Sequence, residues 1–271
     1  MNISLFTHMK EPNKRMDPWK EALLCYEEFS EEVVVVGGDL EEEFIWSDLG
    51  KMIQSGYNKC TGDWVIHLSV DMFIHESNIK EILKCLKQSN DVPAISLPKY
   101  KFFEPGRYEI KNFETVIFNK KYFKNIQFNG GGDLALPTLN KKVLDQSNTK
   151  VLKYPIWNYD TTFRTQEVIS TDRARFARAW NREFGNFGDR GGPTEKQAFT
   201  AWYDMVKTRY PHHTSTTSIS KHPKFIQQKL FDLTPEQFGY NLFGLKDNVS
   251  FKFLNKLKQK KIKIKYNLDS L

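Results

Sequence analysis

The sequence predicts an α/β fold with a mostly parallel, Rossmann-type central sheet, flanking helices and a helical C-terminal part. Strand-like and helix-like segments alternate over roughly the first seventy residues, which is the pattern of a doubly wound α/β protein. One strand-like segment holds four consecutive valines, Val33–Val36, and such a run suits a strand covered on both faces. A second apolar run, Trp64–Leu68, is followed closely by the carboxylate of Asp71.

The first strand is expected at Ile3–Thr7, where apolar residues precede a polar run. A helix is expected next, because apolar residues recur at three- and four-residue steps. These residues are Trp19, Ala22, Leu23, Tyr26 and Phe29. The valine strand then enters Gly37-Gly38-Asp39, which indicates a turn. A second helix is expected over about residues 48–60, before the next strand.

That next strand begins after the turn pair Gly62-Asp63 and ends before Ser69. Asp71 follows two residues later. Because ligands of open α/β sheets bind at the carboxyl ends of the strands, Asp71 is placed for chemistry. An aspartate after a strand is also a common turn or helix-cap residue, and that alternative stays open.

The run G-D-W, apolar residues and then an acid resembles the strand-plus-acid element of family-two-like glycosyltransferases of the GT-A fold. In that family the strand leads into a motif of the form D-x-D or Q-A-D-E. Its second aspartate meets the metal-bound diphosphate of the sugar nucleotide. On this alignment Asp71 stands at the second aspartate of the motif and Ser69 at the first, so the motif is degenerate. The resemblance places Ser69 near the ribose of the donor.

The resemblance extends to other segments of residues 1–165 and implies a nucleotide-sugar-binding and catalytic core there. The family's first strand ends in Thr or Pro and is followed by Asn-Glu, for which Thr7 and Glu11 are the nearest matches. An aspartate after the second strand binds the base, and Asp39 takes that place. The family's phosphate-binding arginine has no counterpart in the next helix, where Lys51 is a candidate substitute.

Two later segments offer further candidates. Residues 100–108 mix aromatic and charged side chains, which predicts either a sugar-stacking surface or a turn with core aromatics. Three glycines then precede Asp133, and such a run permits close approach of the backbone to a ligand. The resemblance implies a carboxylate in this loop as general base, with Asp133 first and Glu104 and Asp160 in reserve; a glycine-rich hairpin is the alternative.

The segment Val151–Asp160 reads as a last strand and resembles the family segment whose histidine completes the metal site. Asn158 stands at that histidine, and Arg164 lies near a family arginine that contacts the donor. Asp160 is a good oxygen ligand for Mn²⁺ or Mg²⁺, the implied cofactor, together with Asp71. Ser69 and Asn158 are both departures from the metal site of the family.

Residues 166–271 are expected to form a helical, basic extension on the acceptor side or as a lid. The 271-residue chain has a net charge of +7, with acids crowding its early part and basic residues dominating after Arg164. A helix is expected from Thr171-Asp172, and a second after Pro193, with Thr194 and Gln197 at capping-box spacing. Seven lysines without an acid mark residues 252–265, so this tail is expected to contact an anionic surface or to remain a solvated tail.

Taken together, the resemblance implies an inverting glycosyltransferase that uses a UDP- or GDP-type sugar and a hydroxyl acceptor. The acceptor class stays open among glycan, lipid-linked, protein and nucleic acid. A non-catalytic binding protein of the same fold is one alternative, and a nucleic-acid-binding protein that uses the basic half is another. The three cysteines lack metal spacing, and no leader-like or membrane-spanning run is visible, so a cytoplasmic location is expected.

Overall fold

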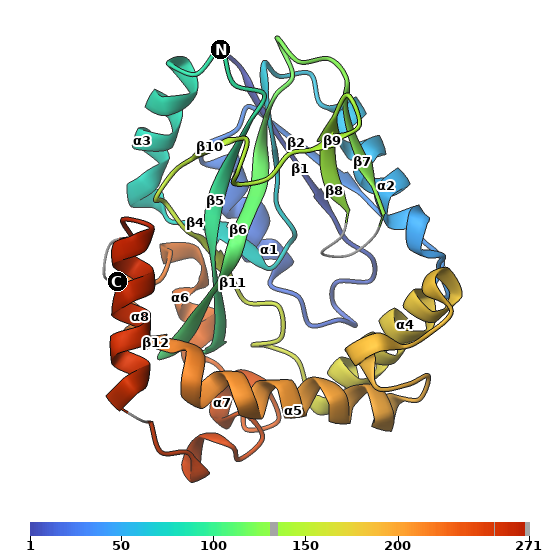
Figure 1. Ribbon diagram of the computed structural model, residues 1–271, viewed down its shortest axis with the longest axis vertical. Helices are drawn as coiled ribbons and strands as arrows, with labels where there is room; N and C mark the ends of the chain where they lie inside the picture. The colour runs from blue at the N-terminus through green and yellow to red at the C-terminus, as the bar shows by residue number, and fades with distance from the viewer. Residues whose placement is uncertain (131–134, 252, 269–271) are drawn as a thin grey trace.

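The computed structural model describes residues 1–130, 135–251 and 253–268 (Figure 1). Within these residues nine strands form the central sheet: β1 (Ile3–His8), β2 (Glu32–Val36), β3 (Trp64–His67), β4 (Met72–Ile74), β5 (Ala94–Glu104), β6 (Arg107–Asn119), β10 (Lys150–Val151), β11 (Ile156–Asn158) and β12 (Thr214–Thr216). Their main path is β2-β1-β3-β6-β5-β11-β4, with β10 beside β5 and β12 beside β6. Only β4 and β6 run against the other strands of this sheet.

Both faces of the sheet are covered. The helices α1 (Trp19–Glu27), α3 (Glu76–Lys87) and α6 (Lys224–Phe231) pack on one face, and α2 (Trp46–Lys59) packs on the other (Figure 1). A small antiparallel sheet shares the second face: β7 (Ile126–Asn129), β8 (Leu136–Leu139) and β9 (Lys142–Val143). Because side chains alternate along a strand, Leu5 and Ile66 join the first core, whereas Phe6 and Val65 join the second.

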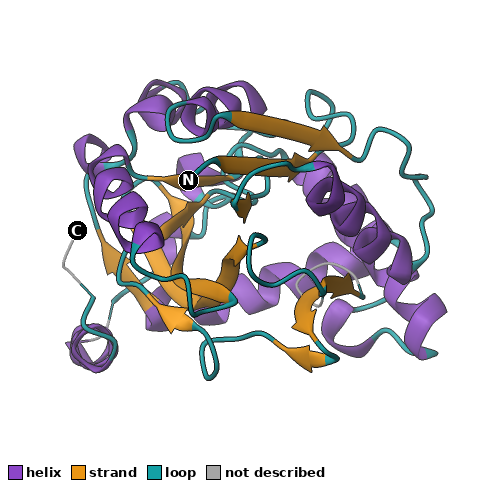
Figure 2. Cartoon of the chain, turned by 90° about the horizontal axis from the view of Figure 1, so that it is seen from above, coloured by secondary structure: helices purple, strands orange, loops and turns teal. Residues whose placement is uncertain are grey.

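The C-terminal part is mainly helical and contains α4 (Gln166–Phe184), α5 (Glu195–His213), α7 (Phe238–Asn241) and α8 (Phe253–Lys265). α4 and α5 lie at one end of the sheet, whereas α8 stands at the side of the molecule (Figures 1 and 2). Ala179 of α4 packs with Trp46 and Leu49 in the first turn of α2. Trp202 of α5 and Phe238 of α7 share an apolar cluster with the end of β5. The predicted fold class, with a mostly parallel sheet and a helical C-terminal part, is therefore confirmed.

Three local predictions need correction. The first C-terminal helix begins at Gln166 and not at Thr171, because the Thr165 side chain accepts the cap hydrogen bond from Val168 N. Residues 100–108 form the β5–β6 hairpin, whose aromatic side chains are buried, so the core alternative is the right one. The expected strand over Val151–Asp160 is split into β10 and β11, with Pro155, which lacks a backbone N–H, between them.

Other predictions are confirmed. Thr194 and Gln197 form the expected capping box of α5. The cysteines Cys25, Cys60 and Cys85 are free thiols. No helix in the described parts of the chain is both long enough and apolar enough to cross a membrane.

Candidate functional site

The candidate site lies where three neighbouring parallel strands end. β1 pairs with both β2 and β3, with Thr7 opposite Val35 and Phe6 opposite His67, so their carboxyl ends meet at one edge. Asp71 follows β3 at this edge. Its side chain is 8% exposed, and its Oδ1 has no hydrogen-bond partner among the described residues. A buried carboxylate oxygen without a partner is costly, which marks Asp71 as a functional candidate.

The antiparallel pairing of β4 with β11 brings Asp160 next to Asp71. Asn158 lies opposite Met72, and Tyr159 N donates a hydrogen bond to Asp71 O at 2.8 Å. Burial, reinforced by the negative charge of Asp160, raises the pKa of Asp71 to about 7. The two predicted metal ligands are thus neighbours.

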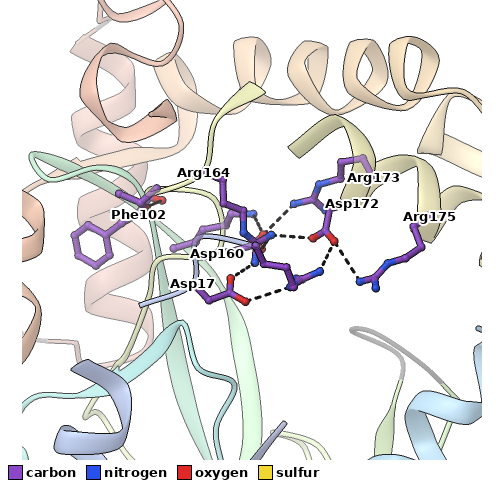
Figure 3. A network of polar contacts seen from close by, with 10 residues as sticks. Asp17, Phe102, Asp160, Arg164, Asp172, Arg173 and Arg175 are labelled. Carbon is purple, nitrogen blue, oxygen red and sulfur yellow. Dashed lines mark hydrogen bonds and ion pairs between the residues drawn. The ribbon is translucent and has the colours of Figure 1, made fainter. Parts of the chain in front are cut away.

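Asp160 is surrounded by cations (Figure 3). Its carboxylate lies 3.1 Å from Lys101 Nζ, 3.0 Å from Arg173 Nη2 and 3.5 Å from Arg164 Nη1. Burial opposes the charge of Asp160, but these three cations outweigh it and hold the pKa of Asp160 well below its usual range. Two adjacent carboxyl groups therefore differ in charge near neutral pH, with Asp160 ionised and Asp71 partly protonated.

Arg164 is the centre of the surrounding interactions. This side chain is 4% exposed, and its guanidinium contacts Asp17 at 2.6 Å and Asp172 at 2.9 Å. Burial lowers the pKa of Arg164, but the carboxylates of Asp17, Asp172 and Asp160 raise it by more than burial lowers it. The guanidinium therefore stays charged. We call the full set the charged network: Arg15, Asp17, Lys101, Asp160, Arg164, Asp172, Arg173 and Arg175.

The other predicted site residues lie outside the charged network. The Thr7 side chain is fully buried, whereas Glu11 and Asp39 are exposed in the loops after β1 and β2. Ser69 contributes a backbone carbonyl that accepts a hydrogen bond from the Tyr26 hydroxyl at 2.6 Å. Asp133 falls within residues 131–134, outside the described residues. The roles assigned to these residues stay predictions.

Sequence reasoning missed several members of the charged network. Asp17 stands in no motif, Lys101 lies in the segment expected to stack sugars or form a turn, and Asp172 marks only the expected start of a helix. Each meets a partner that is distant in sequence or on another element. Arg173 belongs to α4, in the part of the chain where basic residues dominate. Its actual partner is Asp160, a carboxylate of the chain itself, so only the crowding of arginines signalled the network.

The described residues contain no cluster of three or more His, Cys, Asp or Glu side chains with the arrangement of a metal site, and a role of Asp71 and Asp160 in binding a divalent cation stays a prediction. Asp160, the better of the two expected ligands, already has three cationic partners, and a bound metal ion would lie beside them. The positive charge available at this edge comes from Lys101 and the arginines.

No family model matches this chain, and no curated protein matches it. Among solved structures, the chain is similar to S. aureus TarS, with 11% identity and a TM-score of 0.37 over 92% of this chain and 55% of that chain. It thus spans about half the length of that protein. S. aureus TarS 1–349 in complex with UDP-GlcNAc has 13% identity and a TM-score of 0.36, covering 92% of this chain and 91% of that one.

A further similar structure is CMP:2-keto-3-deoxy-manno-octonic acid synthetase complexed with CTP. Its identity is 10% and its TM-score 0.28, over 46% of this chain and 77% of that chain. Similarity at this level leaves the question of function to the residues of the site.

Proposed function

We propose that this protein is a glycosyltransferase that moves a sugar from a nucleoside-diphosphate sugar to a hydroxyl acceptor. The observation that carries the proposal is Asp71, a buried carboxyl group with an unpartnered oxygen at the carboxyl ends of β1–β3. Ligands of open α/β sheets bind at this edge. The resemblance of residues 61–71 to the strand-plus-acid element of GT-A enzymes supplies the reaction class.

In this proposal the donor lies across the strand ends. Its base is near Thr7 and Asp39, its ribose near Ser69 and its diphosphate near Asp71. Lys101 and Arg173 contact Asp160, which is next to Asp71. In this proposal their two positive charges stabilise the nucleoside diphosphate as it departs. The departing diphosphate carries the largest charge that forms in the reaction, and fixed cations stabilise it without any reorganisation of solvent.

The reaction requires a base at the acceptor. The acceptor oxygen attacks the anomeric carbon and gives its proton to a carboxylate, while the bond to the diphosphate breaks and its electron pair leaves with the phosphate. Asp133 stays our first proposal for this base. Asp160 is a poor proton acceptor because its pKa is low, and the Glu104 carboxylate is held by Tyr210 and Lys246.

A calorimetric and thermal-shift panel of UDP, GDP, CMP and dTDP, each with and without Mn²⁺, tests the donor site. We expect one nucleoside diphosphate to bind the wild type and to bind Asp71→Asn at least about tenfold differently, which corresponds to about 1.4 kcal/mol. The exposed Asp91→Asn variant is the matched control and should bind as the wild type does. If no nucleotide shifts the wild type under either condition, the proposal fails and a non-catalytic binding protein becomes the better description.

The Lys-rich C-terminal segment is proposed as a contact for an anionic surface. α8 presents exposed lysines together with Leu257 and Ile264, which are 44% and 70% exposed. Its opposite face is fixed to β12, where Asn255 donates a hydrogen bond to Thr214 O. An amphipathic basic helix of this kind suits an anionic lipid surface. Binding to anionic vesicles, and none to neutral vesicles in co-sedimentation, is the expected result; equal binding to both would contradict it.

A further inference from the structure

A polar groove of about 910 Å³ lies between α2 and β7, on the second face of the sheet. In Figure 1 the two elements run beside each other at the edge of the molecule. α2 connects the carboxyl end of β2 to the start of β3, so the first turn of α2 is at the same edge as Asp71. The groove therefore runs along α2 and ends near the charged network, but no member of that network lines it.

Local sequence patterns build both walls of the groove. On α2 the lining positions 47, 51, 54, 55 and 58 share one face because they recur at three- and four-residue steps. On β7 the side chains alternate, so Gln127 is exposed in the groove while Ile126 and Phe128 are buried. Gln54 of α2 connects the two walls, because its Oε1 accepts a hydrogen bond from Phe128 N of β7 at 2.9 Å. Its Nε2 donates a hydrogen bond to Asn58 Oδ1, on the same helix, at 2.8 Å.

A glycine of α2 allows the two walls of the groove to approach closely. A Cβ added at Gly50 would lie 2.7 Å from Gly130 O, so only glycine lets the end of β7 approach α2 this closely. The walls of the groove are thus part of the packed fold, and the carboxamides of Gln54 and Asn58 are held by hydrogen bonds before any ligand binds. A binding surface prepared in this way loses less conformational entropy when a ligand is bound.

The lining chemistry specifies a ligand class. The groove contains three lysines, Lys51, Lys59 and Lys124, and no acid among its lining residues. It also contains carboxamides on both walls, and a carboxamide both donates and accepts hydrogen bonds, as sugar hydroxyls require. Its one aromatic residue, Phe128, is 5% exposed, so nucleobases would find no ring on which to stack.

We propose that this groove binds an anionic glycan, with hydroxyls on the carboxamides and carboxylate or phosphate groups on the lysines. The proposal rests on the proposed function in one respect: the glycan is the acceptor chain, or an extension of it, that leads to the site. Binding itself does not depend on catalysis. Lys59 and Lys124 are exposed at the end of the groove away from the first turn of α2, so a ligand that reaches them must extend along the groove.

The test measures binding of fluorescent hexagalacturonate, with neutral maltohexaose and single-stranded oligothymidine as the other probes. We expect the wild type to prefer hexagalacturonate. The double variant Lys59→Ala/Lys124→Ala should bind it at least about tenfold more weakly, and Asn125→Ala/Gln127→Ala should weaken it without changing its salt dependence. The matched control, Lys80→Ala/Lys87→Ala, removes two exposed lysines of α3 and should bind within about twofold of the wild type.

A phosphorylated oligosaccharide of similar length then distinguishes carboxylate from phosphate as the preferred anion. Equal loss in the two lysine double variants, preference for oligothymidine, or failure of every anionic glycan to bind would each overturn the proposal. Glycan binding without any binding of the nucleotide panel would leave the groove standing and overturn the glycosyltransferase. Nucleotide binding without glycan binding would do the reverse.

Discussion

Asp71 and Asp160 are chemically the same side chain in opposite states, and their surroundings explain the difference. Asp71 is buried with one oxygen unpartnered, and its pKa rises to about 7. Asp160 faces three cations, which hold its pKa well below the usual range. Neighbouring groups whose pKa values are driven apart are typical of sites that handle protons and charge.

The raised pKa of Asp71 predicts a pH dependence of stability. The folded protein keeps the Asp71 proton up to about pH 7, whereas the unfolded chain releases it near pH 4, so Asp71 destabilises the fold increasingly across that range. Asp71→Asn should therefore raise the free energy of unfolding by about 1–3 kcal/mol at pH 8, with a smaller gain at pH 5.

Urea unfolding of the wild type and the variant at both pH values measures this difference. Asp91→Asn, at an exposed carboxylate, serves as the control and should show no such trend. A stability gain that is the same at pH 5 and pH 8 would mean that Asp71 is ionised throughout and would contradict the raised pKa.

At the scale of elements, the turn that carries Asp71 is held by α1, the helix that connects β1 to β2. The Tyr26 hydroxyl of α1 lies 2.6 Å from Ser69 O and 2.9 Å from Met72 O. Met72 N also donates to Ser69 O at 2.8 Å, which closes the turn. α1 thus sets the position of Asp71, although Tyr26 belongs to a helix face that the sequence marks only as apolar.

Two tyrosines provide a matched test of this positioning. Tyr26→Phe removes a hydroxyl with two carbonyl partners and should destabilise the protein by about 1–2 kcal/mol. Tyr57→Phe removes a buried hydroxyl that has no partner among the described residues, so it should be neutral or slightly stabilising.

Chemical denaturation compares the two variants, and nucleotide titration adds a second readout. Tyr26→Phe should also weaken binding in the nucleotide panel, while Tyr57→Phe should leave it unchanged. Equal effects of the two substitutions on stability and on binding would show that the Tyr26 hydroxyl does not hold the turn.

At the scale of the whole molecule, several ion pairs join the acidic early part of the chain to the basic later part. Glu43, in the acidic early part, contacts Arg178 and Arg182 of α4. Other pairs join the two parts of the chain in the same way: Glu28–Lys224, Glu21–Lys229 and Asp17–Arg164. These particular basic residues are therefore engaged by carboxylates, which weakens the charge-based argument for nucleic-acid binding by this part of the chain.

These pairs differ in burial, and that difference predicts their energetic weight. Arg164→Ala leaves the buried Asp17 and the half-buried Asp172 without one of their cationic partners, and should cost about 3–5 kcal/mol. Arg178 lies in α4, and its side chain is 35% exposed, so Arg178→Ala should lower the free energy of unfolding by at most about 1 kcal/mol. Thermal and urea unfolding measure both. A cost for Arg164→Ala no greater than that for Arg178→Ala would contradict the central place of Arg164.

The sequence by itself determined the alternation of strands and helices over roughly the first seventy residues, the two-sided burial of the sheet, the capping box of α5 and the place of Asp71 after β3. All of these follow from periodicity and from residues close together in the chain. Only the tertiary structure decided which charges meet, because Asp17 and Arg164 are 147 positions apart and no local pattern links them. The same holds for Lys101 with Asp160 and for the groove between α2 and β7. Burial and long-range ion pairing set the electrostatics of the site, and both exist only once the chain has folded.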